Sequence, residues 1–186
     1  MRRKSPLIAC VFLVLSAVFH FPARARPVEE LNCPLGSLTG AQRDAFKAFV
    51  AERGARDDPR NLVVEESLLR CATRFGWSRD HGLLARAFLA SSAGEAQVRD
   101  RLVGRGLNLA EIDATIAADG ALLESMARLH VVQGAREFMA RHSSLLDALV
   151  VGVAAPEQLA AMGELYDFIR FRGMREFSGR AFVGMN

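Results

Sequence analysis

Apolar residues recur every three or four positions along nearly all of the chain after residue 36. This spacing puts them on one face of an α-helix, as in the first such stretch, where Phe46, Phe49 and Val50 fall together before Gly54 interrupts the pattern. No stretch has the alternating, β-branched pattern of a strand except residues 148–153, which we interpret as helix. The pattern predicts helices at about 39–53, 62–75, 78–91, 92–103, 108–118, 121–142 and 145–153, and a last long helix from residue 156.

Residues with helix-capping side chains precede several of these stretches. Thr39 with Gln42, and Ser92 with Glu95, have the spacing of a capping box, in which two residues exchange hydrogen bonds at the start of a helix. Asn108 stands where its side-chain oxygen can cap the helix that follows. These residues predict that a new helix begins at each of the three places.

Two long helices are expected in the second half of the chain. In the predicted helix at 121–142, the longest of all, Met126 and Leu129 belong to the inward stripe, and His130 beside it is interpreted as an interior histidine. In the last helix, Leu159 and Leu165 align on one face. The proline at position 156 suits the first turn of that helix.

The fold predicted from these elements is all-α. Residues 37–186 form one domain, a compact bundle of six to eight mostly short helices, and no linker or repeat of fixed period divides it. Residues 26–36 contain Pro27 and Pro34 and are expected to be an irregular lead-in. The predicted domain is long enough to bury a core of its own.

Residues 1–25 have the order of a secretory signal peptide. Three basic residues come first, residues 7–21 are almost purely apolar, and the Ala-Arg-Ala of residues 23–25 suits a signal peptidase. The apolar run is shorter than the roughly 20 residues that a membrane-spanning helix needs. We therefore expect cleavage near residue 25 and a periplasmic or secreted protein. Retention of the segment as an N-terminal anchor is the alternative.

The charge of the chain depends on that segment. The whole sequence has 24 Lys+Arg, 21 Asp+Glu and a formal charge of +3. Four of the basic residues and none of the acidic ones lie in residues 1–25, so the remainder has 20 basic and 21 acidic residues and a charge of −1. A nucleic-acid-binding domain carries a basic surface, and the mature chain as a whole is not basic. We expect no nucleic-acid partner.

Cys33 and Cys71 are the cysteines left when Cys10 is removed with the signal peptide. In an oxidising compartment such a pair is a candidate disulfide. A short turn makes the first two predicted helices antiparallel, which brings the end of the second near Cys33 and supports the bond. Two buried free thiols are the alternative. Neither cysteine has a nearby histidine, so no metal site is expected.

His81 is the position that most resembles an enzyme residue, because Ser78 and Asp80 precede it in a turn. A catalytic triad needs groups that converge in space, and neighbours in sequence do not establish this. We favour the interpretation that Ser78 and Asp80 cap a helix, and we assign no catalytic residue. No zinc, di-iron or phosphate-loop pattern occurs, so no cofactor is expected.

The C-terminal stretch interleaves aromatic residues with four arginines, Arg170, Arg172, Arg175 and Arg180. One interpretation is contact with an anionic membrane surface or an acidic partner. The other is a closing helix whose phenylalanines pack while its arginines are solvated.

Leu38, Thr39, Gln42 and Arg43 carry a resemblance to a known family. The stretch Leu-Thr-Gly-Ala-Gln-Arg at 38–43 is similar to the Leu-Thr-x-x-Gln motif of the Spy/CpxP-type periplasmic stress proteins, and residues 154–158 resemble a degenerate second copy. The resemblance implies a small α-helical chaperone or stress-sensor partner that cradles unfolded clients and carries no cofactor.

Our leading hypothesis is therefore an exported, non-enzymatic protein that binds other proteins, as a chaperone or stress adaptor. The alternative is a small lipid or apolar-ligand binding protein, with contact to lipid or a membrane surface. A small hydrolase that uses His81 is the least favoured. A concave apolar groove between the helices would distinguish a binding protein from a bundle that packs shut.

Overall fold

The computed structural model of the chain describes residues 26–52, 54 and 57–185. The predicted signal peptide at 1–25 lies outside the described residues. Within them the secondary structure is helical and contains no strand, which confirms the all-α prediction. None of the helices in this part of the chain is long and apolar enough to cross a membrane.

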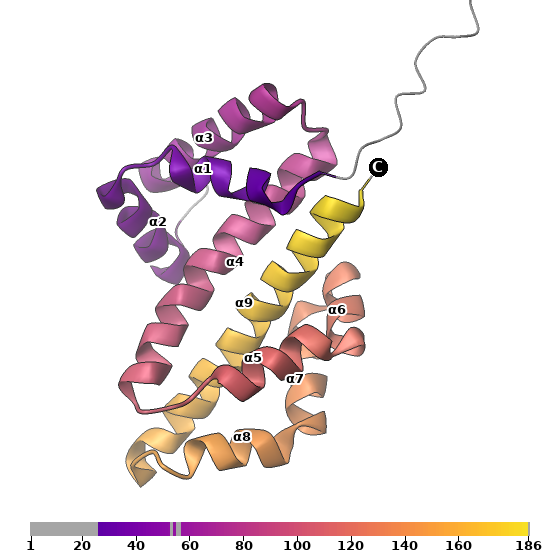
Figure 1. The fold of residues 1–186 in the computed structure, drawn as a ribbon. Coiled ribbons are helices and arrows are strands. Elements are labelled where there is room, and N and C mark those ends of the chain that lie inside the picture. Colours follow the sequence, from indigo (N-terminus) through magenta and orange to yellow (C-terminus); the bar gives the residue numbers. More distant parts are fainter. Residues whose placement is uncertain (1–25, 53, 55–56, 186) are drawn as a thin grey trace, which may run out of the picture.

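The helices follow one another with short connections (Figure 1). In chain order they are the 3-10 helix η1 (Val28–Asn32), α1 (Cys33–Gly36), α2 (Gly40–Glu52), α3 (Pro59–Phe75), α4 (Arg79–Gly104), α5 (Ala110–Ala118), α6 (Gly120–Ala127), α7 (Val131–Arg141), α8 (Ser143–Val150), the 3-10 helix η2 (Ala155–Glu157) and α9 (Gln158–Gly184). The expectation of an irregular lead-in at 26–36 is wrong, because η1 and α1 occupy most of it.

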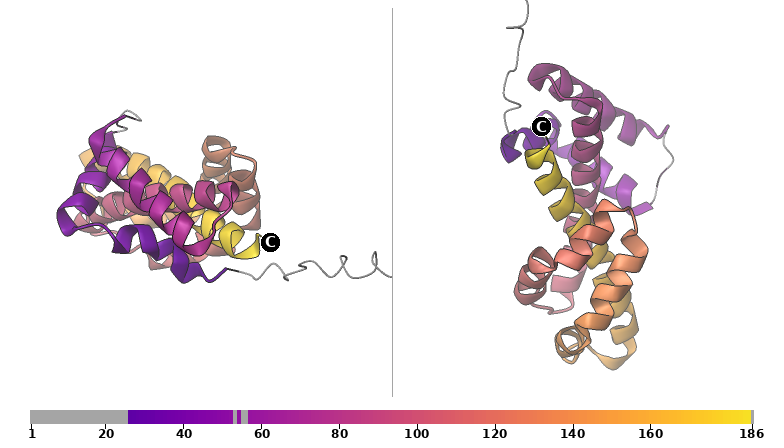
Figure 2. Two further views of the ribbon diagram at one scale, coloured as in Figure 1. Left: turned by 90° about the horizontal axis from the view of Figure 1, so that it is seen from above. Right: turned by 90° about the vertical axis from the view of Figure 1, so that its right-hand side faces the viewer.

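Helices α4 and α9 are the centre of the molecule. They have 26 and 27 residues and lie side by side in opposite directions. Helices α2 and α3 pack on α4, and α5 to α8 pack on α9 (Figures 1 and 2). The long antiparallel pair thus joins an N-terminal and a C-terminal group of shorter helices.

Each group of shorter helices has its own apolar cluster. The N-terminal cluster contains Leu31, Trp77 and Leu89, and Phe182 near the end of α9 completes it. The C-terminal cluster is larger, and its fully buried members include Leu102, Ile112, Met126, Phe138 and Phe168. Both clusters bury large side chains fully, and such burial is the main favourable contribution to folding.

Several predicted helix boundaries are present in the structure. Thr39 and Gln42 form the capping box, in which the Thr39 N–H donates to Gln42 Oε1 at 2.9 Å and the Gln42 N–H donates to Thr39 Oγ1 at 3.2 Å. Gly76 ends α3 with a φ of 64°, a left-handed conformation that glycine adopts without strain. Helix α3 begins before the predicted residue 62, because Asp58 caps it and Pro59 occupies its first position.

The predicted helix start at Ser92 is wrong. Helix α4 continues through this position, and Ser92 Oγ donates a hydrogen bond to the Phe88 carbonyl at 2.7 Å instead of capping a new helix. Glu95, the other half of the expected capping box, turns inward and is 2% exposed. Ser92 and Glu95 have the spacing of a capping box, but both lie in the interior of α4.

The predicted helix at 121–142 is also wrong, because α6 and α7 are separate helices. Leu129 lies between them with a φ of 60°, and it is 77% exposed instead of part of an inward stripe. The chain reverses direction at Leu129, so α7 packs closely against α6. The packing is so close that a Cβ at Gly134 would lie 2.4 Å from Ser125 Oγ. His130 follows Leu129 in this turn and is exposed, so the expectation of an interior histidine is wrong.

Leu159 is a further correction, since it is 86% exposed. It stands in the first turn of α9, and the helix reaches the core only at Ala161 and Leu165, which are fully buried.

Candidate functional site

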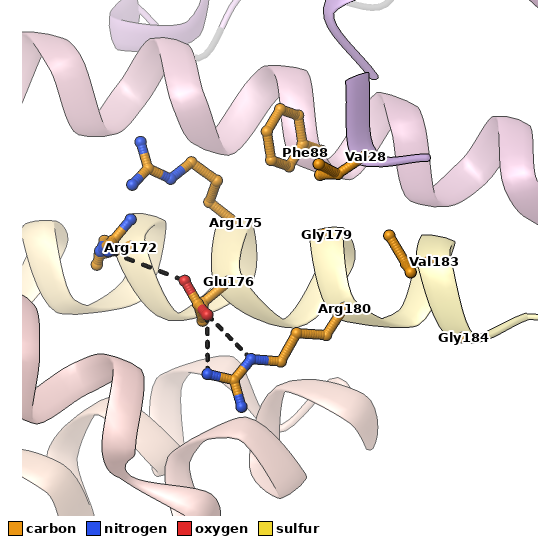
Figure 3. Close-up of a pocket in the computed structure, with 9 residues that line it drawn as sticks. All are labelled: Val28, Phe88, Arg172, Arg175, Glu176, Gly179, Arg180, Val183 and Gly184. Carbon is orange, nitrogen blue, oxygen red and sulfur yellow. Dashed lines mark hydrogen bonds and ion pairs between the residues drawn. The ribbon is translucent and has the colours of Figure 1, made fainter. Parts of the chain in front are cut away.

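An open groove of about 570 Å³ lies along α9, with α4 and η1 as its walls (Figure 3). Most of its lining comes from one face of the last three turns of α9. The lining residues are Val28, Phe88, Arg172, Arg175, Glu176, Gly179, Arg180, Val183 and Gly184. A site of this volume is within the range of about 300–1,000 Å³ that is typical of small-ligand sites.

The end of the groove near the C-terminus is apolar. Phe88 of α4 and Val28 of η1 lie next to each other on one side, and Val183 of α9 lies beyond them (Figure 3). Gly179 has no side chain to occupy the space between them. A Cβ there would meet the Phe88 ring at 3.6 Å, an ordinary contact distance, so the glycine leaves room without forcing the helices together.

The other end of the groove is rich in arginine. Glu176 lies between two of these arginines, with its carboxylate 2.9 Å from Arg180 Nη2 and 3.8 Å from Arg172 Nη2. Arg175 extends toward α4, whereas Arg180 extends the opposite way, toward α5 (Figure 3), where its Nη2 donates to the Ala117 carbonyl at 2.8 Å. The polar and apolar parts of the groove are therefore separated along α9.

A buried carboxylate on α4 pairs with an arginine at this end of the groove. Glu95 of α4 contacts Arg99 Nη2 through Oε1 at 3.0 Å and Arg175 Nε through Oε2 at 3.0 Å. Burial raises the pKa of the Glu95 carboxyl, and the hydrogen bond from Arg99 and the charges of Arg172 and Arg99 oppose that rise. The two arginine contacts offset only part of the cost of burying this carboxylate, which is 2% exposed, so its pKa stays raised.

Asp113 of α5 extends this network to a third helix. Its carboxylate lies 2.8 Å from Arg99 Nη2 and 3.2 Å from Arg172 Nε. The guanidinium of Arg99 also lies over the Phe168 ring, 4.9 Å from the centroid. Arg172 and Arg175 each place Nε beside an acid of another helix as an ion pair, while Arg172 Nε and Glu95 Oε2 make no hydrogen bond among the described residues.

The structure brings three of the four predicted arginines to this groove. The side chains of Arg172 and Arg175 are 16% and 29% exposed and are paired internally, so they are not a solvated face. Arg170 takes a different direction, paired with Asp167 at 3.1 Å and placed over the Tyr166 ring. Contact with an anionic partner stays a prediction.

Cys33 and Cys71 are joined as a disulfide, with their Cα atoms 6.1 Å apart, as predicted. The bond ties α1 to α3. Arg26, just before η1, donates from its guanidinium to the carbonyls of Phe75 and Gly76 at 2.8 and 2.7 Å. Together these links hold η1, and with it Val28, against the groove.

The motif residues of the family resemblance have structural roles at the start of α2. Leu38 is buried in the N-terminal cluster, and Thr39 and Gln42 cap the helix, while Arg43 is exposed. None of the four lines the groove.

His81 is 7% exposed at the start of α4. Its Nδ1 lies 2.6 Å from Ser78 Oγ, and its ring meets the Phe182 ring edge-on at a centroid distance of 5.3 Å. Its Nε2 is buried and has no hydrogen-bond partner among the described residues. Within that part of the chain, no carboxylate orients the imidazole as in a Ser-His-Asp arrangement. The same residues contain no group of three metal-ligating side chains close enough to hold an ion.

Sequence reasoning missed Phe88, which lines the groove, and Glu95 and Asp113, which pair with its arginines. One local signal was available, because Glu95 and Arg99 have the i,i+4 spacing of an ion pair on a helix. The pairing of Glu95 with α9 and the pairing of Asp113 with α9 join residues far apart in the sequence, so no local pattern predicts them.

Comparisons of the chain with protein-family models, with curated proteins and with solved structures found no match. A function is therefore inferred from the groove and from the residues that form it.

Proposed function

We propose that this protein is a small-molecule binding protein that holds a lipid-like ligand in the groove formed by α4, α9 and η1. The observation that carries the proposal is the apolar end of the groove, where Phe88, Val28 and Val183 surround the bare position at Gly179. Apolar walls with a few polar groups at one end are the usual composition of such sites.

An alkyl chain that fills this end buries part of its surface. A fully buried CH₂ group contributes roughly 0.8 kcal/mol. In an open groove about half of each group is covered, so about ten groups contribute roughly 4 kcal/mol, which matches the lower estimates of the free energy lost on association, about 4 kcal/mol.

The walls of the groove are held in place by contacts that involve no ligand. The α4–α9 packing positions Phe88 against α9, and the Cys33–Cys71 bond with the Arg26 hydrogen bonds positions Val28. A site organised before binding loses less conformational entropy when the ligand arrives.

Native mass spectrometry of the protein purified from its own host tests the proposal. We expect a bound lipid-like molecule on the wild type and on Gly179→Ala, in which the added methyl group fits against Phe88. Gly179→Leu extends a larger side chain into the groove and should come without ligand. An empty wild-type protein, or a Gly179→Leu variant that is equally loaded, would contradict the proposal.

A second candidate function is binding of other proteins, our leading hypothesis from the sequence. Leu62, Leu69 and Leu83 on α3 and α4 are 48%, 69% and 56% exposed. Leu62 and Leu69 are one helical turn from Glu65 on α3, and Leu83 is one turn before Arg86 on α4. The Glu65–Arg86 ion pair, at 2.8 Å, joins the two helices. Exposed apolar side chains gathered in one region favour contact with a partner.

The protein-binding candidate predicts that the purified protein suppresses aggregation of an unfolded client. Replacing Leu69 and Leu83 by serine should abolish the effect, whereas Gly179→Leu should leave it unchanged. A protein that is inert in this assay and captures no partner from a periplasmic extract would contradict the candidate.

Export is part of both candidates. The charge pattern and apolar run of residues 1–25 support it. N-terminal sequencing of the protein from its own host should find a start near Arg26, and a chain that begins at Met1 would favour the retained anchor instead.

A further inference from the structure

We propose that the ligand of this groove is an amphiphile whose polar head carries a single negative charge, bound by Arg172 and Arg175. This inference rests on the proposed ligand-binding function and specifies its substrate class. A fatty-acid carboxylate and the phosphodiester of a single-chain phospholipid both have the required chemistry.

Charge is separated along the part of α9 that lines the groove. Arg172, Arg175 and Glu176 precede Gly179 in the helix, and Val183 follows it (Figure 3). Arg180 also follows Gly179, but its guanidinium turns back to pair with Glu176. At 1.5 Å per residue, Arg175 and Val183 are about 12 Å apart along the helix axis. A molecule lying along α9 therefore meets arginines at one end and apolar side chains at the other.

Both arginines have terminal nitrogens that make no hydrogen bond within the groove. Arg175 pairs with Glu95 through Nε at 3.0 Å, and its two Nη groups make no hydrogen bond or ion pair with another residue that lines the groove (Figure 3). Arg172 pairs with Asp113 through Nε at 3.2 Å, and its Nη2 is 3.8 Å from Glu176, too far for a hydrogen bond. The terminal nitrogens of both guanidinium groups therefore remain for a ligand that accepts two hydrogen bonds.

The network of ion pairs around the arginine end carries a net charge. Its members are four arginines and three carboxylates, Arg99, Arg172, Arg175, Arg180, Glu95, Asp113 and Glu176. One positive charge is in excess. In a partly buried site this charge is screened less than in water, so one anionic group on the ligand balances it.

Isothermal titration calorimetry with matched amphiphiles tests the head-group charge. Dodecanoate is compared with dodecyltrimethylammonium, and lauroyl-lysophosphatidylglycerol is compared with lauroyl-lysophosphatidylcholine, each below its micelle concentration. Each of these amphiphiles has one chain of about twelve carbons, and the heads within a pair differ in charge. We expect the anionic member of at least one pair to bind about tenfold or more tightly than its partner, and the pair that responds more strongly distinguishes a carboxylate from a phosphodiester ligand.

Two variants in the groove test the role of the network. Glu176→Gln removes a carboxylate that competes for Arg172 and should tighten binding of the anion by about threefold to tenfold. Arg180→Gln removes the excess charge and should weaken it by a similar factor. Arg128→Gln on α6 is the control, because Arg128 is an exposed arginine paired with Glu124 and does not line the groove. A merely structural role for Glu176 would not produce tighter binding.

The outcomes separate this inference from the proposed function. Equal binding of anionic, cationic and zwitterionic amphiphiles would overturn the inference and leave an apolar-ligand site. No binding of any amphiphile would overturn the proposed function and the inference with it. Tighter binding of the anion with no response to Glu176→Gln or Arg180→Gln would place the anion elsewhere and overturn the inference.

Discussion

The carboxylate of Glu95 on α4 lies 3.0 Å from Nε of Arg175 on α9. This ion pair joins the two central helices. It orients the Arg175 side chain from α9 toward α4, along the groove. Glu95 also contacts Arg99, so the buried carboxylate has two cationic partners. Removing both partners would leave the buried carboxylate uncompensated, and loss of the partner of a buried charge typically costs about 3–5 kcal/mol.

The titration of Glu95 gives the first prediction. Burial raises the pKa of Glu95 above its ordinary value of 4.5. The protonated form is thus favoured in the folded state, so the stabilisation is complete below pH 4.5 and is lost as the pH rises through the raised pKa. Relative to Glu95→Gln, the wild type should lose unfolding free energy from below pH 4.5 to neutrality. Urea unfolding of both proteins over this range measures the difference, and a constant difference would contradict the assignment.

Two glycines in the α4–α9 pair should respond oppositely to alanine. Gly179→Ala should raise the unfolding free energy by about 0.5–1 kcal/mol, because its Cβ meets Phe88 at 3.6 Å and alanine favours the helix. Gly94→Ala should lower it by about 1–3 kcal/mol, because a Cβ there would lie 2.5 Å from the Phe171 ring. Chemical denaturation of the two variants measures both changes in unfolding free energy. Changes of the same sign and size would contradict this spacing between α4 and α9.

Leu129 should be a site where glycine stabilises. Its φ of 60° is unfavourable for leucine, and its side chain is 77% exposed. Leu129→Gly should raise the unfolding free energy by up to about 1 kcal/mol. Leu69→Gly is the matched control, because Leu69 is 69% exposed in the middle of α3 and the variant should lose about 0.5–1 kcal/mol. Destabilisation by both would argue for a continuous helix in place of the α6–α7 turn.

Reduction of the Cys33–Cys71 bond should weaken both the fold and the groove. The bond closes a loop with a sequence separation of 38, which corresponds to about 4 kcal/mol on the chain-entropy model. Reductant should lower the melting temperature and the affinity for dodecanoate, since η1 loses an anchor. The Cys33→Ala, Cys71→Ala double variant should be insensitive to reductant. Unchanged affinity after reduction would show that the bond does not support the Val28 wall.

The helical class, the Thr39–Gln42 cap and the disulfide followed from the sequence because each has a local or pairwise signal. Helical periodicity and capping depend on residues three or four positions apart, and the two cysteines meet through a single helix hairpin. The break at Leu129 had no such signal, because close packing of Gly134 against Ser125 stabilises it.

The groove could not be predicted for a related reason. The Ser92–Glu95 spacing suits a capping box, yet Glu95 turns inward because Arg175, far away in sequence, is there to pair with it. The C-terminal arginines were recognised as a group, but their separation into internal pairs depends on which acids α4 and α5 bring to α9. Such tertiary ion pairs override the local pattern.

The most direct test of the account is an NMR titration of the isotope-labelled protein with dodecanoate. We predict that amide shift changes concentrate at Val28, Phe88, Gly179 and Val183, with intermolecular NOEs from the alkyl chain to Phe88 and Val183 and a shift of the Arg175 Nε–H resonance. Shift changes confined to other surfaces, such as the turn that contains Leu129, or no change at all, would contradict it.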